Sequence, residues 1–151
     1  EWFVNHGADI DDCQVRNILC VWDEESEANA RTSISDFYEQ YKNHAKEEIL
    51  AVKKETLEND GAVSEKCARE MAVGAVKASG ARASLAVTGI AGPGGGTEEK
   101  PVGLVYIGCC IDDQVWVERH QFQGDRQMVR SLTVQRAMEM LCQCMTQWDE
   151  R

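Results

Sequence analysis

A loop rich in glycine lies between two apolar runs of the chain. The stretch "TGIAGPGGGTEEKPVG", residues 88–103, holds six of the chain's 12 glycines and both of its prolines. Glycine has no Cβ atom and tolerates positive φ, so successive backbone N–H groups in such a loop can converge on an anion. The loop follows a predicted strand, where ligand sites of α/β proteins usually lie. From the residues alone, a ligand-facing loop and a simple flexible connection both remain open.

Two common nucleotide-binding fingerprints are missing from this loop. Its central string, "GPGGGT", contains neither the G-x-x-x-x-G-K-[ST] of a P-loop nor a G-x-G-x-x-G that leads into a helix. The next predicted element is a strand. The loop therefore belongs to neither of those nucleotide-binding classes.

The string as a whole points to one family. "VTGIAGPGGGTEEKPVGLVYI", with "GAVSEKCAREMAVGA" before it and "FQGDRQMVR" after it, resembles the CinA C-terminal domain family from about Tyr41 to the C-terminus. The resemblance implies a nicotinamide mononucleotide deamidase of pyridine-nucleotide salvage. Such an enzyme hydrolyses the carboxamide of its small nucleotide substrate to nicotinate mononucleotide and ammonia, without a metal or organic cofactor. The resemblance also implies a homo-oligomer.

The same resemblance assigns a catalytic segment upstream. "YKNHAKEEIL" is similar to the family's Y-S-N-x-x-K, which puts Tyr41, Asn43 and Lys46 on functional positions, with Lys42 in place of the usual serine. Tyr41 and Lys46 are then catalytic and Asn43 binds the ligand. The implied role of the lysine is that of a general base paired with a serine nucleophile.

An independent physical argument makes Lys46 a reasonable base. If Asn43 caps a helix that runs through Leu50, the ammonium of Lys46 lies in the first turn, where the helix dipole disfavours a cation. The like charge of Lys42 acts in the same direction. Both effects lower a lysine pKa from about 10.4 toward the neutral range that a base needs, whereas two neighbouring glutamates oppose them. A surface lysine in a charged helix is the alternative.

The resemblance also marks the residues that bind the ligand. Thr88, Gly89 and Ile90 match the family's T-G-I, and their backbone amides could polarise the carboxamide or hold the mononucleotide. Arg126, in "GDR", matches a family arginine, and its planar guanidinium suits a phosphate. A first-turn arginine on a solvated helix is the alternative for that residue. The glycines that would shape the wall of the site are Gly92, Gly94, Gly95 and Gly96.

The chain departs from the family at the nucleophile. Family members carry S-C-T-G-G about thirty residues before the lysine, and its serine accepts the acyl group. The corresponding region here is "GADIDDCQVRNILCVW", in which Asp12 takes the place of the serine if Cys13 matches the family cysteine. A carboxylate is a weak nucleophile toward an amide. Ser33, Ser35 and Cys13 are poor substitutes, so a nucleotide-binding or interaction module without catalysis is the alternative function.

The elements that must position these residues follow from periodicity. In "VSEKCAREMAVGAVKASG" apolar residues recur at intervals of four from Val63, with Ser64 as the N-cap and Gly80 as the stop. Strands are predicted over residues 83–88, 102–111 and 114–122, the last two as an antiparallel hairpin across the acidic turn at 112–113. A final helix over residues 126–148 is capped by Asp125.

This order predicts an α/β fold. We expect a single three-layer α/β/α domain over residues 1–151, with a mixed sheet and a divergent segment at 1–40. A second domain is not expected in a chain of this length.

Composition narrows the function classes further. A formal net charge of −10 opposes general nucleic-acid binding, which depends on clustered lysine and arginine. The seven cysteines contain no C-x-x-C spacing, which favours a reducing cytoplasm and argues against a zinc or redox site. The longest apolar run is too short to span a membrane, and no leader is evident. We therefore expect a cytoplasmic protein that binds neither membranes nor nucleic acids.

Overall fold

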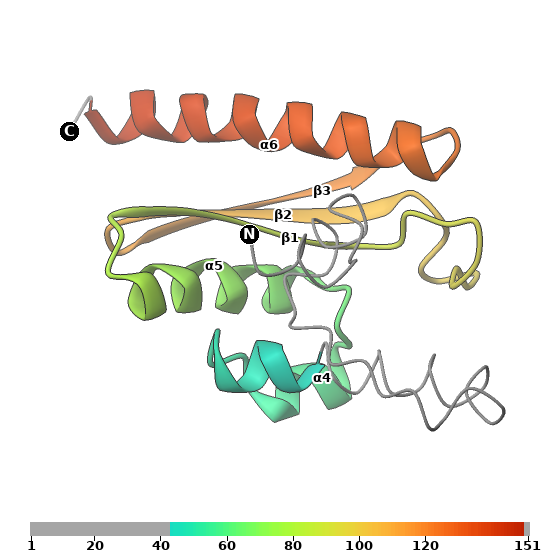
Figure 1. Cartoon of the computed structure of the whole chain (residues 1–151), viewed down its shortest axis with the longest axis horizontal. Helices are drawn as coiled ribbons and strands as arrows, with labels where there is room; N and C mark the ends of the chain where they lie inside the picture. Colours follow the sequence, from blue (N-terminus) through green and yellow to red (C-terminus); the bar gives the residue numbers. More distant parts are fainter. Residues whose placement is uncertain (1–42, 150–151) are drawn as a thin grey trace, which may run out of the picture. The chain divides into compact units, whose positions relative to one another are not determined.

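The computed structural model describes residues 43–149 of the chain. The chain divides into two compact units, Glu1–Ala45 and Lys46–Arg151, and the second holds all the labelled elements of Figure 1. These elements are α4 (Lys54–Asn59), α5 (Glu65–Ser79), β1 (Ala83–Gly89), β2 (Leu104–Ile111), β3 (Gln114–Gln121) and α6 (Arg126–Asp149). The single domain predicted over the whole chain stays a prediction.

Helix α5 begins and ends at the residues that the sequence predicts. The Ser64 side chain accepts a hydrogen bond from the Cys67 backbone amide, and Gly80 ends the helix in the left-handed conformation at φ 68°. Both observations confirm the predicted caps, because an N-cap hydroxyl satisfies an orphan amide and glycine adopts positive φ without strain. The helix in turn fastens α4: the Glu70 carboxylate accepts hydrogen bonds from the Lys53 amide and the Thr56 hydroxyl, at 2.9 and 3.0 Å.

The three strands form one antiparallel sheet in the order β1-β2-β3. Ala83 pairs with Ile111 at one end and Gly89 with Val105 at the other. The predicted hairpin between β2 and β3 is confirmed, with Asp112 at φ 53° in its turn. The fold is thus α/β, with a sheet packed against helices. Within residues 43–149 the sheet is antiparallel throughout, so the mixed sheet that the sequence predicts is not seen there.

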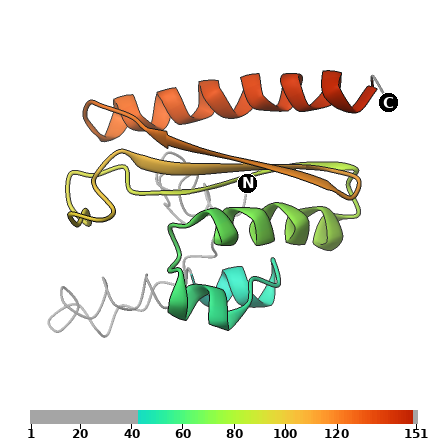
Figure 2. The same ribbon diagram turned by 180° about the vertical axis from the view of Figure 1, so that it is seen from behind.

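Helices α5 and α6 lie against opposite faces of this sheet, as the two side views show (Figures 1 and 2). Alternate residues of β2 serve the two faces, since side chains alternate along a strand. Ile107 and Cys109 belong to the cluster that contains Met140 of α6. Gly108 faces α5, where a Cβ would come within 2.6 Å of the Ala68 carbonyl oxygen. A glycine at this position lets α5 lie directly on the strand.

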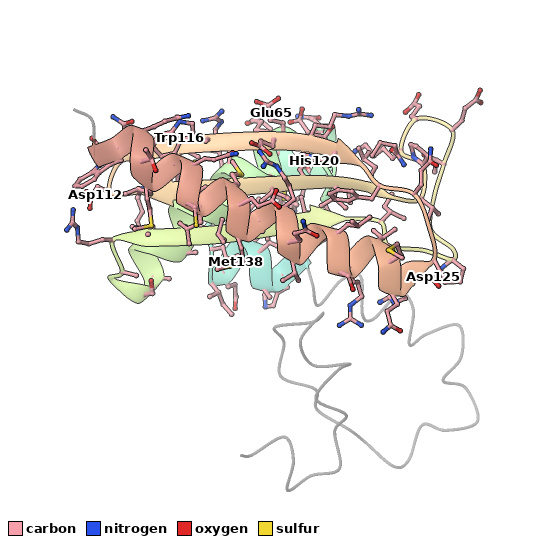
Figure 3. The ribbon with its side chains drawn as sticks, turned by 90° about the horizontal axis from the view of Figure 1, so that it is seen from above. Glu65, Asp112, Trp116, His120, Asp125 and Met138 are labelled. Carbon is pink, nitrogen blue, oxygen red and sulfur yellow. The ribbon has the colours of Figure 1, made fainter. Side chains whose placement is uncertain are left out.

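Helix α6 starts as predicted and crosses the sheet. The Met128 backbone amide donates a hydrogen bond of 2.8 Å to the Asp125 carboxylate, which confirms Asp125 as the cap. Seen from above, α6 runs from the end of the sheet at Asp125 toward the opposite end, where the Asp112 turn lies (Figure 3). None of the helices in residues 43–149 combines the length and the apolar character that crossing a bilayer requires.

Candidate functional site

The glycine-rich loop of residues 88–103 starts at the end of β1 with Thr88, which is 7% exposed. The Thr88 hydroxyl donates a hydrogen bond of 2.6 Å to the carbonyl oxygen of Ala62, in the connection between α4 and α5. This proton is therefore used within the protein. A ligand would meet the lone pairs of the hydroxyl oxygen and the backbone of the strand end.

The far side of the loop is held by Lys100. Its Nζ donates a hydrogen bond of 2.6 Å to the carbonyl oxygen of Asp60. Lys100 also closes a turn with Thr97: the Thr97 amide donates to the Lys100 carbonyl oxygen at 2.9 Å, and the Lys100 amide donates to the Thr97 hydroxyl oxygen at 3.0 Å. Both sides of the loop are thus attached to residues 60–62.

Arg126 holds the middle of the loop. Its guanidinium donates a hydrogen bond of 2.9 Å to the carbonyl oxygen of Gly92, which itself adopts φ 84° and precedes a cis peptide bond to Pro93. The sequence predicts Arg126 as a phosphate ligand. In the structure at least one of its N–H groups is engaged by the loop. Its position beside Gly92 does bring it to the predicted ligand wall.

The backbone amides that could face a ligand differ in part from those predicted. The Ile90 amide donates a hydrogen bond of 2.9 Å to the Leu104 carbonyl oxygen, so it continues the sheet. Ile90 therefore contributes no free donor, because the register of β1 on β2 uses it. Among the described residues, amides with no hydrogen-bond partner occur further along the loop, at Ala91, Gly92, Gly94 and Gly95.

Lys46 lies in the same unit of the chain as the loop. Its charge and that of Lys100 both lower the pKa of one buried thiol. The ammonium groups of both residues exert a field on the Cys67 thiol, in the first turn of α5. Burial raises the pKa of this thiol to about 11, and the two lysines oppose that rise. Little thiolate exists at neutral pH, so Cys67 is an unsuitable substitute for the missing nucleophile.

The helix that carries Lys46 differs from the predicted one. Residues 43–48 are helical, so Asn43 lies inside the helix rather than capping it, and the helix ends before Leu50. The chain then turns at Ala51, at φ 52°, and the Val52 amide donates to the Lys46 carbonyl oxygen at 2.9 Å. The Asn43 side-chain oxygen is buried and accepts no hydrogen bond. Tyr41 and the candidate nucleophiles lie outside the described residues.

The sequence misses Lys100 and the connection at residues 60–62. The signal was present, since Lys100 belongs to the family string EKPVG, but its carbonyl partner lies 40 residues away. Lys100 and Arg126 give a chain of net charge −10 a pair of cations at the loop that carries the free amides. Such a group suits an anionic ligand. No three His, Cys, Asp or Glu side chains in residues 43–149 are grouped to hold a metal ion.

Comparison with known families decides the relationship. The model of the CinA C-terminal domain matches residues 32–145. The chain belongs to the CinA C-terminal domain family. The resemblance seen in the TGIAGPGGG and EKPVG strings is thereby confirmed, and it extends over both the glycine-rich loop and Lys46.

Relatives of this CinA-family chain are larger proteins. A competence-damage inducible protein of Clostridium perfringens is 58% identical over 101 residues, which make up 67% of this chain and 24% of that protein. The similarly named protein of Clostridium acetobutylicum is 50% identical over 101 residues, or 67% of this chain and 25% of that protein. The chain thus matches only a small part of their length.

Solved structures of the family share the fold. The competence/damage inducible protein CihA of Agrobacterium tumefaciens is 45% identical with a TM-score of 0.65, covering 68% of this chain and 63% of that one. A CinA superfamily protein of Escherichia coli is 40% identical with a TM-score of 0.65, covering 68% of this chain and 59% of that one. More than a third of each of these chains therefore has no counterpart in the match.

Proposed function

We propose that this chain is a nicotinamide-nucleotide amidohydrolase, which hydrolyses the carboxamide of nicotinamide mononucleotide to nicotinate mononucleotide and ammonia. One observation carries the proposal: the glycine-rich loop presents amides without partners at Ala91, Gly92, Gly94 and Gly95, and the Lys100 and Arg126 side chains hold this loop by hydrogen bonds. This arrangement supports a wall for an anionic nucleotide, and Lys46, the candidate base, belongs to the same unit of the chain. Membership of the CinA family supplies the reaction class.

Each residue of the site has a role in this proposal. The free amides from Ala91 onward stabilise the negative charge that develops on the carboxamide oxygen. Arg126 attracts the phosphate, while the Thr88 oxygen accepts a hydrogen bond from the ligand. Lys46 removes the proton from the attacking group and returns it to the departing ammonia. The family match is the basis for proposing Tyr41 as catalytic and Asn43 as ligand-binding. Gly89, Gly94 and Gly95 allow the backbone to approach the nucleotide.

The experiment is an assay with the purified chain and a matched variant. We expect ammonia and nicotinate mononucleotide in equal amounts from nicotinamide mononucleotide, measured by a coupled assay and by chromatography. Lys46→Met should lower the rate by about 100-fold or more, the usual contribution of a general base. Nicotinamide riboside, which lacks the phosphate, should be a poorer substrate. Ammonia release that is equal in the wild type and in Lys46→Met contradicts the proposal.

A second candidate function is a nucleotide-binding module without turnover. The observation that favours it is the missing S-C-T-G-G string, whose place in the family precedes residue 32, where the family match begins. This candidate predicts saturable binding of the mononucleotide in calorimetry with no product after long incubation. Absence of both heat and product rejects the two candidates together.

The quaternary and sheet arrangements expected of the family belong to the same proposal. A mixed sheet in a three-layer domain needs a parallel strand beyond those of residues 43–149. We also propose a cytoplasmic homo-oligomer, and its test is given in the Discussion.

A further inference from the structure

We propose that Lys100 is a positioning residue of the nucleotide site: its ammonium clamps the glycine-rich loop onto the connection between α4 and α5. The clamp holds the unpartnered loop amides ready for the ligand. This inference rests on the proposed function, because it gives a role in nucleotide binding to a side chain that points into the protein's own backbone. Its consequence is measurable apart from catalysis.

The Lys100 ammonium has a defined hydrogen-bond acceptor and a space that fits it. Lys100 Nζ donates a hydrogen bond of 2.6 Å to the Asp60 carbonyl oxygen, and the next residue is Gly61 at φ 80°. A Cβ on Gly61 would lie 2.8 Å from Lys100 Nζ. The glycine thus leaves the space that the ammonium occupies. The bond is charge-assisted and joins residues 40 positions apart, so it restricts the loop far more than a local turn does.

The clamp works beside a second attachment to the same connection. The Thr88 hydroxyl reaches the carbonyl oxygen of Ala62, two residues beyond the receptor of Lys100. The start and the far side of the loop are therefore both hydrogen-bonded to one short segment, residues 60–62. Arg126 holds Gly92 between them. If the Lys100 attachment is lost, the other two hold only the part of the loop up to Gly92, and the stretch from Pro93 to Lys100 is no longer attached to residues 60–62.

The stretch under the clamp has few other restraints. Its residues 93–99 are exposed, and the amides of Gly94 and Gly95 have no hydrogen-bond partner among the described residues. A loop that is not held must be ordered by its ligand, and that ordering lowers affinity. A clamped loop presents its amides already in place. Lys100 therefore improves nucleotide affinity in addition to any attraction of its charge.

The chain offers a matched control for the charge. Lys66 Nζ lies 3.3 Å from the Asp60 carboxylate, so it contacts the same residue as Lys100 but does not touch the loop. Removing Lys66 changes the net charge by the same amount and leaves the clamp in place. A comparison of Lys100→Met with Lys66→Met separates clamping from general electrostatics.

The experiment measures binding and loop exchange in the full chain. Calorimetry gives Kd for nicotinamide mononucleotide, and hydrogen exchange with mass spectrometry follows peptides that cover residues 91–103. We expect Lys100→Met to raise Kd about tenfold and to speed exchange in those peptides before ligand is added. Lys66→Met should change Kd less than about twofold and leave exchange unchanged. Lys100→Arg, which keeps a charged donor, should recover most of the affinity.

The outcomes are distinct. If Lys100→Met speeds hydrogen exchange but leaves Kd unchanged, the positioning role is overturned and Lys100 has only a structural role. If hydrogen exchange is unchanged in Lys100→Met, the clamp itself is overturned. Equal losses of affinity in Lys100→Met and Lys66→Met also overturn it, because net charge then explains the effect. If the wild type turns over substrate, Lys100→Met should raise KM and leave kcat within about twofold. A wild type that binds no mononucleotide overturns the proposed function, while the exchange result still decides the clamp.

Discussion

Three side chains of the candidate site donate hydrogen bonds to carbonyl oxygens of the main chain. Thr88, Lys100 and Arg126 each donate to a backbone oxygen, at 2.6, 2.6 and 2.9 Å. These bonds shape the loop, and the glycines allow the shape. Among the glycines of the loop, Gly103 has the tightest steric constraint. Its φ is 90°, and a Cβ added there would meet the Phe122 carbonyl oxygen. Two backbone hydrogen bonds depend on this close approach. The Gly103 amide donates to the Ile90 carbonyl oxygen, and the Gly103 carbonyl oxygen accepts from the Phe122 amide.

Replacing Gly103 should therefore be costly. Gly103→Ala adds a Cβ against backbone that cannot move aside and forces an alanine to positive φ, so we expect a loss of at least about 2 kcal/mol in the free energy of unfolding. Gly94→Ala is the control, because a Cβ there meets nothing within 4 Å. Its effect should stay within about 0.5 kcal/mol. Urea unfolding measures both variants, and similar losses in the two would show that crowding at Gly103 is unimportant.

At the scale of elements, a charged contact joins β3 to α6. The Glu118 carboxylate accepts two hydrogen bonds from the Arg136 guanidinium, at 2.6 and 2.8 Å, and lies 2.8 Å from His120 Nε2. His120 stacks on Phe122 with ring centroids 5.2 Å apart, on the side of the sheet that α6 covers (Figure 3). The hydrogen bonds from Arg136, then that from His120, lower the pKa of Glu118 against the effect of its partial burial.

This contact should make stability depend on pH. A carboxyl whose pKa is lowered by folding stabilises the fold above its unfolded pKa, and this contribution is lost as the pH falls through the folded pKa. We expect Glu118→Gln to cost about 1 kcal/mol at pH 7, a value discounted for the partial exposure of the pair. The difference from wild type should shrink as the pH falls below the ordinary glutamate pKa of 4.5, and it should vanish once Glu118 is protonated in the folded state as well.

Unfolding at several pH values tests this, with Glu98→Gln in the exposed loop as the charge control. A difference between wild type and Glu118→Gln that persists unchanged at low pH would mean that the ion pair is not its source. The control should follow the wild type throughout.

At the scale of the whole molecule, the outer face of α6 lacks a covering element among the described residues. Val134, Met138 and Met145 are 65%, 53% and 54% exposed, and their spacing puts them on one side of the helix. Met138 lies midway along α6 (Figure 3). The strip carries no charge, so two copies can pack it face to face without the repulsion that a net charge of −10 imposes elsewhere. We therefore predict that, in the proposed homo-oligomer, this strip forms the contact between copies.

A charge in the middle of the strip should separate the copies. Met138→Glu should shift the molar mass from light scattering toward that of one chain, because a carboxylate would be buried unpaired in the contact. Gln147→Glu adds the same charge on the same helix outside the strip and should leave the mass unchanged. A wild type that remains a single chain at every concentration contradicts the prediction.

Much of the fold could be predicted because the signals are local. Ser64, Gly80 and Asp125 were recognised as helix ends, since a cap depends on residues within one turn of it. The acidic turn at residues 112–113 identified the hairpin for the same reason. The helix near Lys46 was placed less well: Asn43 resembles a cap in the sequence, yet it lies inside the helix of residues 43–48.

From the sequence, the site could be predicted only as separate sequence motifs, without the contacts between them. The glycine-rich loop and Lys46 were identified by their likeness to the family. That Lys100 holds the loop, that Arg126 binds the Gly92 oxygen and that Ile90 has no free amide were not predicted. Each of these contacts joins residues at least 14 positions apart. Their partners depend on the register of β1 on β2 and on where the helices lie.

The sequence by itself thus determined α5, α6, the three strands and the family, because periodicity, caps and turn residues act over a few neighbouring positions. The tertiary structure alone decided which carbonyl oxygen each cation reaches and which loop amides are left for a ligand. The physical reason is that a side chain's choice among many equivalent backbone oxygens depends on distance in space. That distance is set when α5 and α6 pack onto the two faces of the sheet.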